Sequence, residues 1–574
     1  MPSIIKEWDN YQKGITYNRG LPVNFYTLCD TNANFDAGEQ YPNAGLDDDF
    51  LQPVFNIVNK FTTFFVAYIV SSDVAVKYTS PLKLAADDLS DIVLNASFEE
   101  FRERVKFSKK YRQALKDGTI TGDYIAHLTF SDKKPYDGAY GDEIGQIDMS
   151  LIDATNFYVA DPTDREVQPQ KYIQYDGRSF VSVLNDEREQ FMSDKDSSTI
   201  IEDGDTETQI GDFGDEEIQP ILSDDGKETG SATWVVTYYK KEETREEPLL
   251  DAEGNPELDS DGEPMTKEVT EEWVYSTKCT ENTYIWKDRP LGFNVYPCEL
   301  GNWIEQKNTY HGQTFVKGVV PAQIFINQGF AMAMKHTMDT AFAKFFYDTN
   351  VLPEGITADV STQVGLDLKQ GQSVDDAGKY KTPGNMSDKV IAMIDLAYSY
   401  IKDVVSLTDA ITGNVNPEQA SGASIVAAST QAAIPIEVPK LNSHDWVEGI
   451  ARIYKNMAEN LYGERPVLIE EEGEMVLGTY DFAKLKKMYK PPVIEVGDSS
   501  YWSENNLIQT LDSMLQAGIL DHVEWLEEQP EGKIPNRQKL LKRLKEKAAA
   551  VAPVTDAQDP SLPSTQDVLP NVPV

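Results

Sequence analysis

The spacing of apolar residues in the first quarter of the chain predicts helices and strands in alternation. Apolar residues recur at helical spacing over residues 55–66 and then alternate with polar ones over residues 74–78, which predicts a helix followed by a strand. A second helix is predicted over residues 97–116, because Ser97 is a good N-cap and an apolar stripe follows it. Alternation over residues 121–130 predicts another strand.

Short strand patterns separated by turns fill the next part of the chain. Two strands are predicted on either side of a turn within residues 147–159, and Asp161 and Pro162 end the second of them. Further segments follow: strands over residues 234–241, 271–279 and 283–298, and a polar loop over residues 301–313. This region therefore reads as a β-rich part of an α+β protein.

Two long helices, separated by an interval rich in Gly, Pro and Asp, are predicted from residue 316 onwards. The first covers residues 316–348, with apolar side chains three or four positions apart and Pro321 near its first turn. The interval covers residues 349–386, and the second helix covers residues 387–407. Residues 408–421 then break the periodicity, because Gly and Asn tolerate positive φ and Pro cannot continue a helix.

The last third of the chain is predicted to return from strands to helices. The predicted segments are a proline-kinked helix and strands within residues 422–500, three short helices within residues 501–550, and a disordered tail over residues 551–574. The tail is rich in Pro, Ser and Asp and poor in apolar residues. The overall prediction is an α+β fold of several subdomains.

The charge of the chain limits the kind of surface that it can present. It has 574 residues, which exceeds what one hydrophobic core usually supports, and 95 acidic against 52 basic residues give a formal charge of −43. A surface that grips nucleic acid needs Lys and Arg, so this balance argues against phosphate binding over most of the protein. The negative charge is compatible with a channel wall that repels a polyanion such as DNA. It is equally compatible with a surface whose charge only keeps the protein soluble. An acidic stretch over residues 186–227 is predicted to be a solvent-facing insertion.

Cysteine usage and the apolar runs exclude two further classes. Cys29, Cys279 and Cys298 form no CxxC pair, so neither a disulfide framework nor a zinc site is expected. The longest apolar run, residues 61–70, is too short to cross a bilayer, and the first residues lack the apolar core of a signal peptide. We expect a protein made in a reducing cytosol, without a membrane partner.

Motifs that carry chemistry are absent from the sequence. It contains no HExxH, no GxxxxGK[ST] phosphate loop and no GxSxG elbow, so no catalytic residue, metal site or cofactor is predicted. Residues 251–264 imitate a calcium loop, but Pro256 and Gly262 occupy the positions that need Gly and Glu, which favours a hairpin tip. The abundant carboxylates leave an acidic α+β hydrolase open as an alternative.

The order of helix, polar loop and long kinked helix, formed by residues 387–461, resembles the portal (head-to-tail connector) proteins of tailed bacteriophages. The resemblance extends from about Asn56 to Lys547. It implies a ring-forming fold with these parts: a wing (residues 1–315, with the acidic insertion), a first stem helix (316–348), a clip (349–386), a second stem helix (387–407), a tunnel loop (408–421), the kinked helix and wing strands (422–500), and a helical crown (501–550).

The resemblance also implies a function, a set of partners and site residues. It implies a non-enzymatic homo-oligomer, normally a dodecamer, which is assembled in the host cytoplasm and placed at one capsid vertex of the virion. Its partners would be capsid protein, the terminase large subunit, a head–tail adaptor and the double-stranded DNA that passes through its channel. The implied site residues are Thr412, Asn414, Asn416, Glu418, Gln419 and Ser421 facing the channel, Ile324, Asn327, Met334, Met338, Ile391, Ile394 and Ile401 packing the stem, and Lys533, Lys539, Lys542 and Arg543 contacting DNA at the crown.

Two readings other than a portal remain open from the sequence. One is the acidic hydrolase, and the other is a different structural virion protein of the head–tail junction. For the basic residues of the crown, an ordinary charged helix face is an equal alternative.

Overall fold

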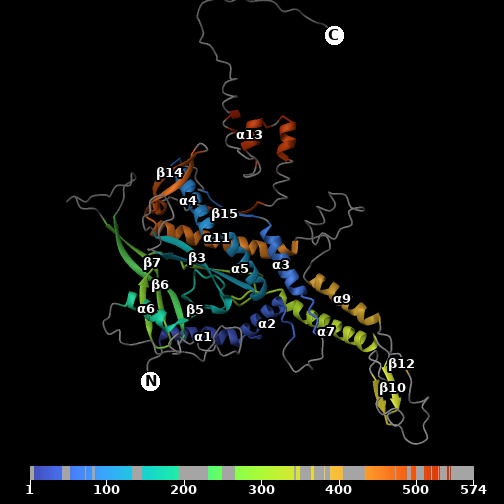
Figure 1. The fold of residues 1–574 in the computed structure, drawn as a ribbon. Coiled ribbons are helices and arrows are strands. Elements are labelled where there is room, and N and C mark those ends of the chain that lie inside the picture. The colour runs from blue at the N-terminus through green and yellow to red at the C-terminus, as the bar shows by residue number, and fades with distance from the viewer. Residues whose placement is uncertain are drawn as a thin grey trace, which may run out of the picture. The chain divides into compact units, whose positions relative to one another are not determined.

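The fold is that of a computed structural model, which describes much of the chain with gaps (Figure 1). The described residues are 5–41, 52–71, 73–79, 85–131, 145–192, 231–248, 266–341, 344–348, 363–367, 380–381, 388–404, 434–471, 474–487, 493–499, 510–518, 520–527, 529, 540–541 and 543–544. The chain divides into two compact units. The first comprises residues 1–469 and 477–498, and the second comprises residues 470–476 and 499–574.

The first unit begins with two helices that the sequence pattern did not predict, α1 (Lys6–Gly20) and α2 (Phe25–Ala37). The side chain of Asn24 caps α2 by accepting a hydrogen bond from the backbone N–H of Tyr26, and Gly38 ends it at a φ of 99°. Both helices carry many Asn, Asp, Thr and Tyr residues, which have modest helix propensity, so packing rather than propensity stabilises them.

The next helix and strand are confirmed, but the predicted helix over residues 97–116 is wrong as a single element. α3 (Ile57–Val70) and β1 (Asp73–Thr79) lie where expected. They are followed by two helices, α4 (Ala85–Arg104) and α5 (Phe107–Thr121), which are separated at Lys106, where φ is 53°. The break lets Phe98 and Phe107 lie on differently oriented helices and both become buried. Ser97 is therefore not an N-cap, and its hydroxyl pairs with that of Tyr454 at 2.6 Å.

The strands form two main antiparallel sheets in this unit. The first has the order β3–β2–β9, from Gln146–Ile152, Asp123–Ser131 and Cys298–Asn302. The second has the order β4–β5–β6–β7–β8, from Phe157–Val159, Tyr172–Phe180, Ser231–Pro248, Thr266–Cys279 and Tyr284–Pro290.

The expectation that β3 and β4 would flank a simple turn as a strand pair is corrected by this topology. The short 3-10 helix η1 (Ala154–Asn156) joins the two strands, and each strand pairs within a different sheet. The positions of β3 and β4 on either side of the turn did not show which strand each would pair with. Strand pairing depends on which faces become buried.

The predicted acidic insertion begins inside a helix, α6 (Val181–Phe191), which packs on the second sheet. Glu187 on this helix accepts a hydrogen bond from Lys278 of β7 at 2.5 Å, and the Lys278 ammonium lies 4.4 Å from the ring centre of Trp234. Burial lowers the pKa of Lys278. The remainder of the insertion, residues 193–227, and the calcium-like loop at 251–264 lie outside the described residues.

Two long helices follow near the predicted positions, with a small sheet between them. The prediction that the first helix continues to residue 348 is wrong, because residues 344–348 form a strand that pairs with two later segments. The helices are α7 (Val316–Ala341) and α9 (Asp388–Val404). Between them, β10 (Lys344–Asp348) pairs in parallel with β11 (Gln363–Leu366) and antiparallel with β12 (Tyr380–Lys381).

The centre of the first unit is α11 (Ile434–Leu461), the helix with prolines near its start. Trp446 on this helix is buried, lying 5.2 Å from Tyr124 and 6.3 Å from Tyr111 between ring centres. Tyr454, two turns later, packs on Phe98 and donates a hydrogen bond to the backbone oxygen of Ser97 at 3.0 Å. α11 therefore binds α4, α5 and the first sheet into one core.

The remaining elements are short. β13 (Glu464–Glu471) and β14 (Glu474–Asp481) form the predicted hairpin, η2 (Phe482–Lys487) follows, and β15 (Val493–Ser499) pairs with β1. In the second unit, residues 510–516 are helical, Gly518 has a φ of 71°, and α13 spans His522–Glu527. These positions agree with the predicted helix, its Gly stop and the helix after it.

A buried acid on the second sheet makes stability depend on pH. Asp176 of β5 is buried, and its Oδ2 accepts a hydrogen bond from the hydroxyl of Tyr11 at 2.9 Å. Burial raises its pKa to about 8, and the hydrogen bond offsets only part of that rise. The folded protein therefore favours the protonated acid, so stability is greatest below pH 3.8 and falls until the pH passes about 8.

We predict that Asp176→Asn flattens this fall. The free energy of unfolding, measured by urea titration from pH 4 to pH 9, should decrease less steeply with pH than in the unmodified protein. Asp161→Asn is the control, because Asp161 is exposed and hydrogen bonds from Thr163 lower its pKa, so it does not titrate in this range. An unchanged slope in Asp176→Asn would contradict the assignment.

Candidate assembly surface on the helix pair

Helices α7 and α9, hereafter the helix pair, lie side by side and lead to strands β10 and β12 at the same end (Figure 1). A Cβ atom at Gly329 of α7 would lie 3.1 Å from Cγ1 of Ile394, so the absence of a side chain allows this close approach. Ile394 and Ile401 are buried along the inner face of α9. The spacing of three and four residues between Ile394, Ala397 and Ile401 is that of one helix face.

The base of α7 is held by a buried network of amide side chains. Gln323 donates to the backbone oxygen of Phe55 at 2.7 Å and to Oδ1 of Asn327 at 2.9 Å, and its Oε1 accepts from the N–H of Ile57 at 3.1 Å. Asn327 in turn donates to Oε1 of Gln40 at 2.6 Å. The network therefore joins α7 to the start of α3 and to the segment that follows α2.

Every amide in this network is buried, so removing one leaves its partners without hydrogen bonds. We predict that Asn327→Leu lowers the free energy of unfolding by about 2–4 kcal/mol, because unsatisfied buried polar groups each cost about 1–3 kcal/mol. Gln328→Leu, on the exposed side of the same helix, is the control and should change it by less than about 0.5 kcal/mol. Equal effects of the two substitutions in urea denaturation would rule out the anchoring role.

α9 carries a second apolar stripe on the side away from α7. Met393, Leu396 and Tyr400 are spaced three and four residues apart and are 54%, 61% and 67% exposed. At about 100° per residue, they lie about 80–160° around the helix axis from Ile394 and Ile401. A surface helix normally turns only one apolar face inward and a polar face to water, so this second stripe requires an explanation.

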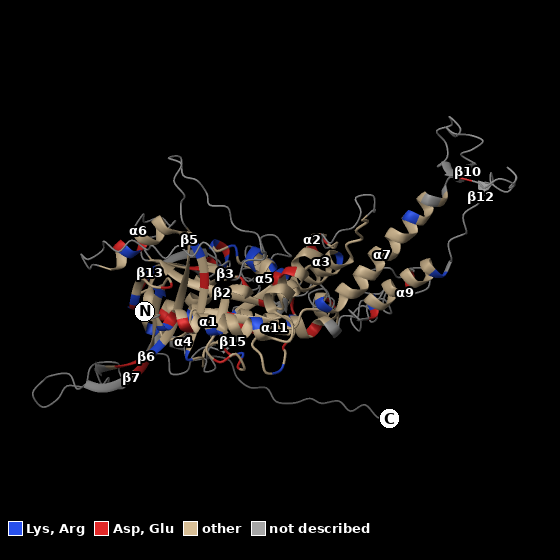
Figure 2. Cartoon of the chain, turned by 90° about the horizontal axis from the view of Figure 1, so that it is seen from below, with Lys and Arg blue, Asp and Glu red and all other residues tan. Residues whose placement is uncertain are grey.

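α7 also exposes large apolar side chains along its length. Phe325, Met332 and Met338 are 43%, 62% and 62% exposed, and Met334 is 39% exposed. Figure 2 shows the helix pair largely free of the red and blue that mark charged residues, apart from a few positions. Two helices that pack together thus both present apolar side chains to the outside, which is typical of a protein–protein interface.

A model of the P22-like phage portal proteins matches residues 48–474, about three quarters of the chain. The chain belongs to the P22-like phage portal protein family. No curated protein matches the sequence.

Membership in the portal family confirms the resemblance. It is favoured over the two alternatives that the sequence left open, an acidic hydrolase and a different structural virion protein. Portal proteins are structural components of the phage capsid rather than enzymes, and a mixed helix-and-sheet fold agrees with the α+β prediction. The matched residues include the whole helix pair and β10–β12. α1 and α2 precede the match, which ends at residue 474, and the assignment of residues 501–550 as a crown stays a prediction.

The predicted stem residues of this portal protein fall into two groups. Asn327, Ile394 and Ile401 are buried within the chain, and Ile324 is half-buried. Met334, Met338 and Ile391 are exposed, with Ile391 at 51%. The structure therefore separates side chains that hold the helix pair together from side chains that remain available for another molecule.

The other predicted site residues are mostly beyond the described part of the chain. The six tunnel-loop residues fall within 405–433, and Lys533, Lys539 and Lys542 are also outside the described residues. Arg543 lies in a short helical piece, residues 543–544. Their roles stay predictions.

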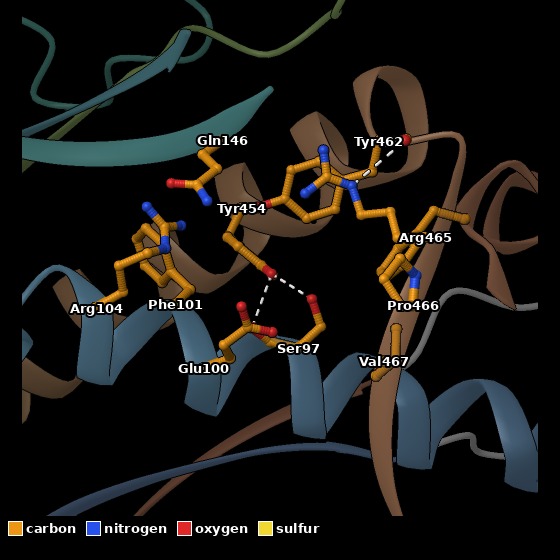
Figure 3. A pocket seen from close by; sticks show the side chains of 11 residues that line it. Ser97, Glu100, Phe101, Arg104, Gln146, Tyr454, Tyr462, Arg465, Pro466 and Val467 are labelled. Atoms are coloured by element: carbon orange, nitrogen blue, oxygen red, sulfur yellow. Dashed lines mark hydrogen bonds between the residues drawn. The ribbon is translucent and has the colours of Figure 1, made fainter. Parts of the chain in front are cut away.

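A small cavity between α4, α11 and β13 is a structural junction rather than a site (Figure 3). Its volume of about 20 Å³ is enough for about one water molecule. Its polar groups have partners in the chain: the guanidinium of Arg465 stacks 3.4 Å from the ring centre of Tyr462, and Arg104 pairs with Asp148 at 3.1 Å. The cavity thus marks where β13 is fastened to the core.

The described residues contain no group of three or more His, Cys, Asp or Glu side chains placed to hold a metal ion. Among the described helices, none has both the length and the apolar composition that a bilayer span requires. The three cysteines are free and buried.

Proposed function

We propose that this portal protein assembles into a ring, a dodecamer, at the unique vertex of the capsid and forms the channel for double-stranded DNA. Two observations support the proposal: membership in the portal family, and the helix pair with outward apolar stripes that the described part of the chain does not cover. Each exposed stripe would lose its contact with water when a second copy packs on it. Burial of apolar surface contributes about 25 cal/mol per Å², which favours such packing.

The stripes of the two helices differ, and this favours a ring over a symmetric pair. In the proposed contact, Met393, Leu396 and Tyr400 of α9 face the outward side chains of α7, such as Met332, in the next copy. An interface between two different surfaces is heterologous, and repeating it around an axis closes into a ring. Methionine suits this contact, since its flexible thioether adapts to the shape of a neighbour.

The remaining parts of the proposed machine follow from chain order. Residues 408–421 lie between α9 and α11 in the chain. They would project into the channel, where their short polar side chains would contact DNA that is moving past. A charge of −43 per chain would limit adhesion of the DNA backbone to the wall. The strands β11 and β12 lie in the segment that we assign as the clip, and β10, which pairs with both, directly precedes it. The clip would dock the terminase large subunit during packaging and the head–tail adaptor afterwards.

We further propose that the ring is assembled in the host cytoplasm, where it contacts capsid protein and nucleates the head. The terminase supplies the work of packaging, and the portal protein itself needs no cofactor. Basic residues between 533 and 547 would contact packaged DNA at the crown.

The ring proposal predicts that a charge within the α9 stripe prevents assembly. Leu396→Glu should leave the circular dichroism spectrum unchanged and abolish annular particles, because a desolvated carboxylate would face apolar side chains. Ser399→Glu, exposed on the same helix but outside the stripe, is the matched control and should keep its rings. Negative-stain microscopy and sedimentation velocity provide the measurement, and persistent rings in Leu396→Glu would refute the assigned contact.

The tunnel-loop assignment predicts a separable defect. Deletion of residues 414–419 should leave rings intact and reduce the amount of DNA packaged or retained per particle. Ring formation is scored by microscopy, and DNA content is scored by nuclease protection. Normal DNA content in the deletion would remove the loop from the channel.

A further inference from the structure

Residues 104–116, which include most of α5, form a basic stretch in an acidic chain. They contain six basic residues and no acidic one, whereas the whole chain has a formal charge of −43. Three of the six have partners on other elements, namely Arg104, Lys110 and Lys116. The other three are exposed and form no ion pair within the described part of the chain, namely Lys106, Lys109 and Arg112, hereafter the basic stripe.

The basic stripe lies on the side of α5 that is turned away from α11. α5 contacts α11 through Tyr111, whose ring centre lies 6.3 Å from that of Trp446 and whose hydroxyl lies 2.9 Å from that of Ser443. At about 100° per residue, Lys109 and Arg112 lie about 160° and about 100° around the axis of α5 from Tyr111. The contact with α11 therefore leaves these two cations free to meet another molecule.

α11 presents a different set of side chains on its side away from α5. Glu437, Leu441 and Asp445 follow one another at intervals of four residues and are exposed, with Leu441 at 51%. Counted from Ser443, they lie about 120–160° around the axis of α11. These three residues, hereafter the acidic stripe, place an exposed leucine between two carboxylates.

The charges of the acidic stripe are not neutralised by the chain itself. Within the described residues, neither Glu437 nor Asp445 forms an ion pair. Arg452 lies on the same side of α11, but it pairs with Glu448. An exposed leucine between two unpaired acids is therefore a surface that a complementary partner could cover.

The two stripes lie on opposite outer sides of one pair of contacting helices. A two-fold contact brings the same surface of both copies together, so each stripe would meet its own charge. A head-to-tail contact instead brings the basic stripe of one copy to the acidic stripe of the next. The arrangement of charge thus favours a repeating contact of the kind that closes into a ring.

We propose that the basic stripe of one copy binds the acidic stripe of the next copy in the ring. This inference rests on the proposed ring and adds a contact that is separate from the helix pair. Lys109 and Arg112 form ion pairs with the carboxylates of Glu437 and Asp445, and Leu441 loses its contact with water between them. A copy that docks in the reverse orientation meets like charges and is rejected.

The observations favour a second copy over nucleic acid as the occupant of the basic stripe. Three cations provide few phosphate contacts, and the acidic chain around them repels a DNA backbone. The acidic stripe requires a partner with exposed cations, and this chain itself carries such a surface on the opposite side. One contact therefore satisfies both stripes.

Two variants of the full-length protein test the contact, each by reversing one stripe. Lys109→Glu with Arg112→Glu makes both outer sides acidic, and Glu437→Lys with Asp445→Lys makes both basic. Either variant alone should need at least about tenfold more protein to form rings, because like charges meet at every contact. An equimolar mixture should form rings as the unmodified protein does, because alternating copies then present opposite charges. Negative-stain microscopy and sedimentation velocity provide the measurement.

Further variants separate the contact from effects of folding and of net charge. A chain with all four substitutions exchanges the stripes and should form rings. Lys6→Glu with Lys171→Glu, exposed and outside both stripes, changes the net charge as the basic-stripe reversal does and should keep its rings. Added salt should partly restore each reversed variant on its own, because screening weakens repulsion between exposed charges. Circular dichroism checks that every variant is folded.

The contact is overturned if either reversed variant forms rings as readily as the unmodified protein, and the ring proposal then still stands. It is also overturned if neither the mixture nor the four-substitution variant assembles. Absence of rings in the unmodified protein would overturn the ring proposal and this contact together. Binding of a duplex DNA fragment that Lys109→Glu with Arg112→Glu abolishes, while rings persist, would assign the basic stripe to nucleic acid instead.

Discussion

α9 has large apolar side chains on two different faces, and the described part of the chain provides a neighbour for only one of them. The inner face, with Ile394 and Ile401, is buried on α7. The outer face, with Leu396 and Tyr400, remains exposed. A helix of this kind is incomplete as a single copy, because exposed apolar surface carries a free-energy cost in water. In the proposed ring, the missing neighbour is another copy of the same chain.

The sequence predicted those elements whose burial is regular. The helices at α3, α7 and α9 and the paired strands β6 and β7 have long periodic patterns, and they were predicted as the right type of element. The end of α7 was placed seven residues too late, and the end of β6 seven residues too early. The errors arose where tertiary contacts override local pattern. The break at Lys106 needs a left-handed backbone at a non-glycine residue, which no residue type announces. The separation of β3 from β4 depends on their pairing partners, because β3 pairs with β2 and β4 pairs with β5 in a different sheet.

The candidate assembly surface on the helix pair was likewise predicted only in part. Apolar positions on the helix pair could be recognised from their spacing, but the spacing did not show which ones face inward, because both faces of α9 carry the same kind of residue.

The hydrogen-bond network at the base of α7 is formed by neutral amide side chains and not by charged ones. Gln40, Gln323 and Asn327 bond to one another and to the backbone, with lengths of 2.6 to 3.3 Å. Dissolved salt screens ionic attraction strongly but affects hydrogen bonds between buried amides very little. A virus particle leaves the crowded interior of a lysing cell for dilute surroundings of any salinity. The direction of α7 relative to the segments that it is bonded to would therefore not change with salt concentration.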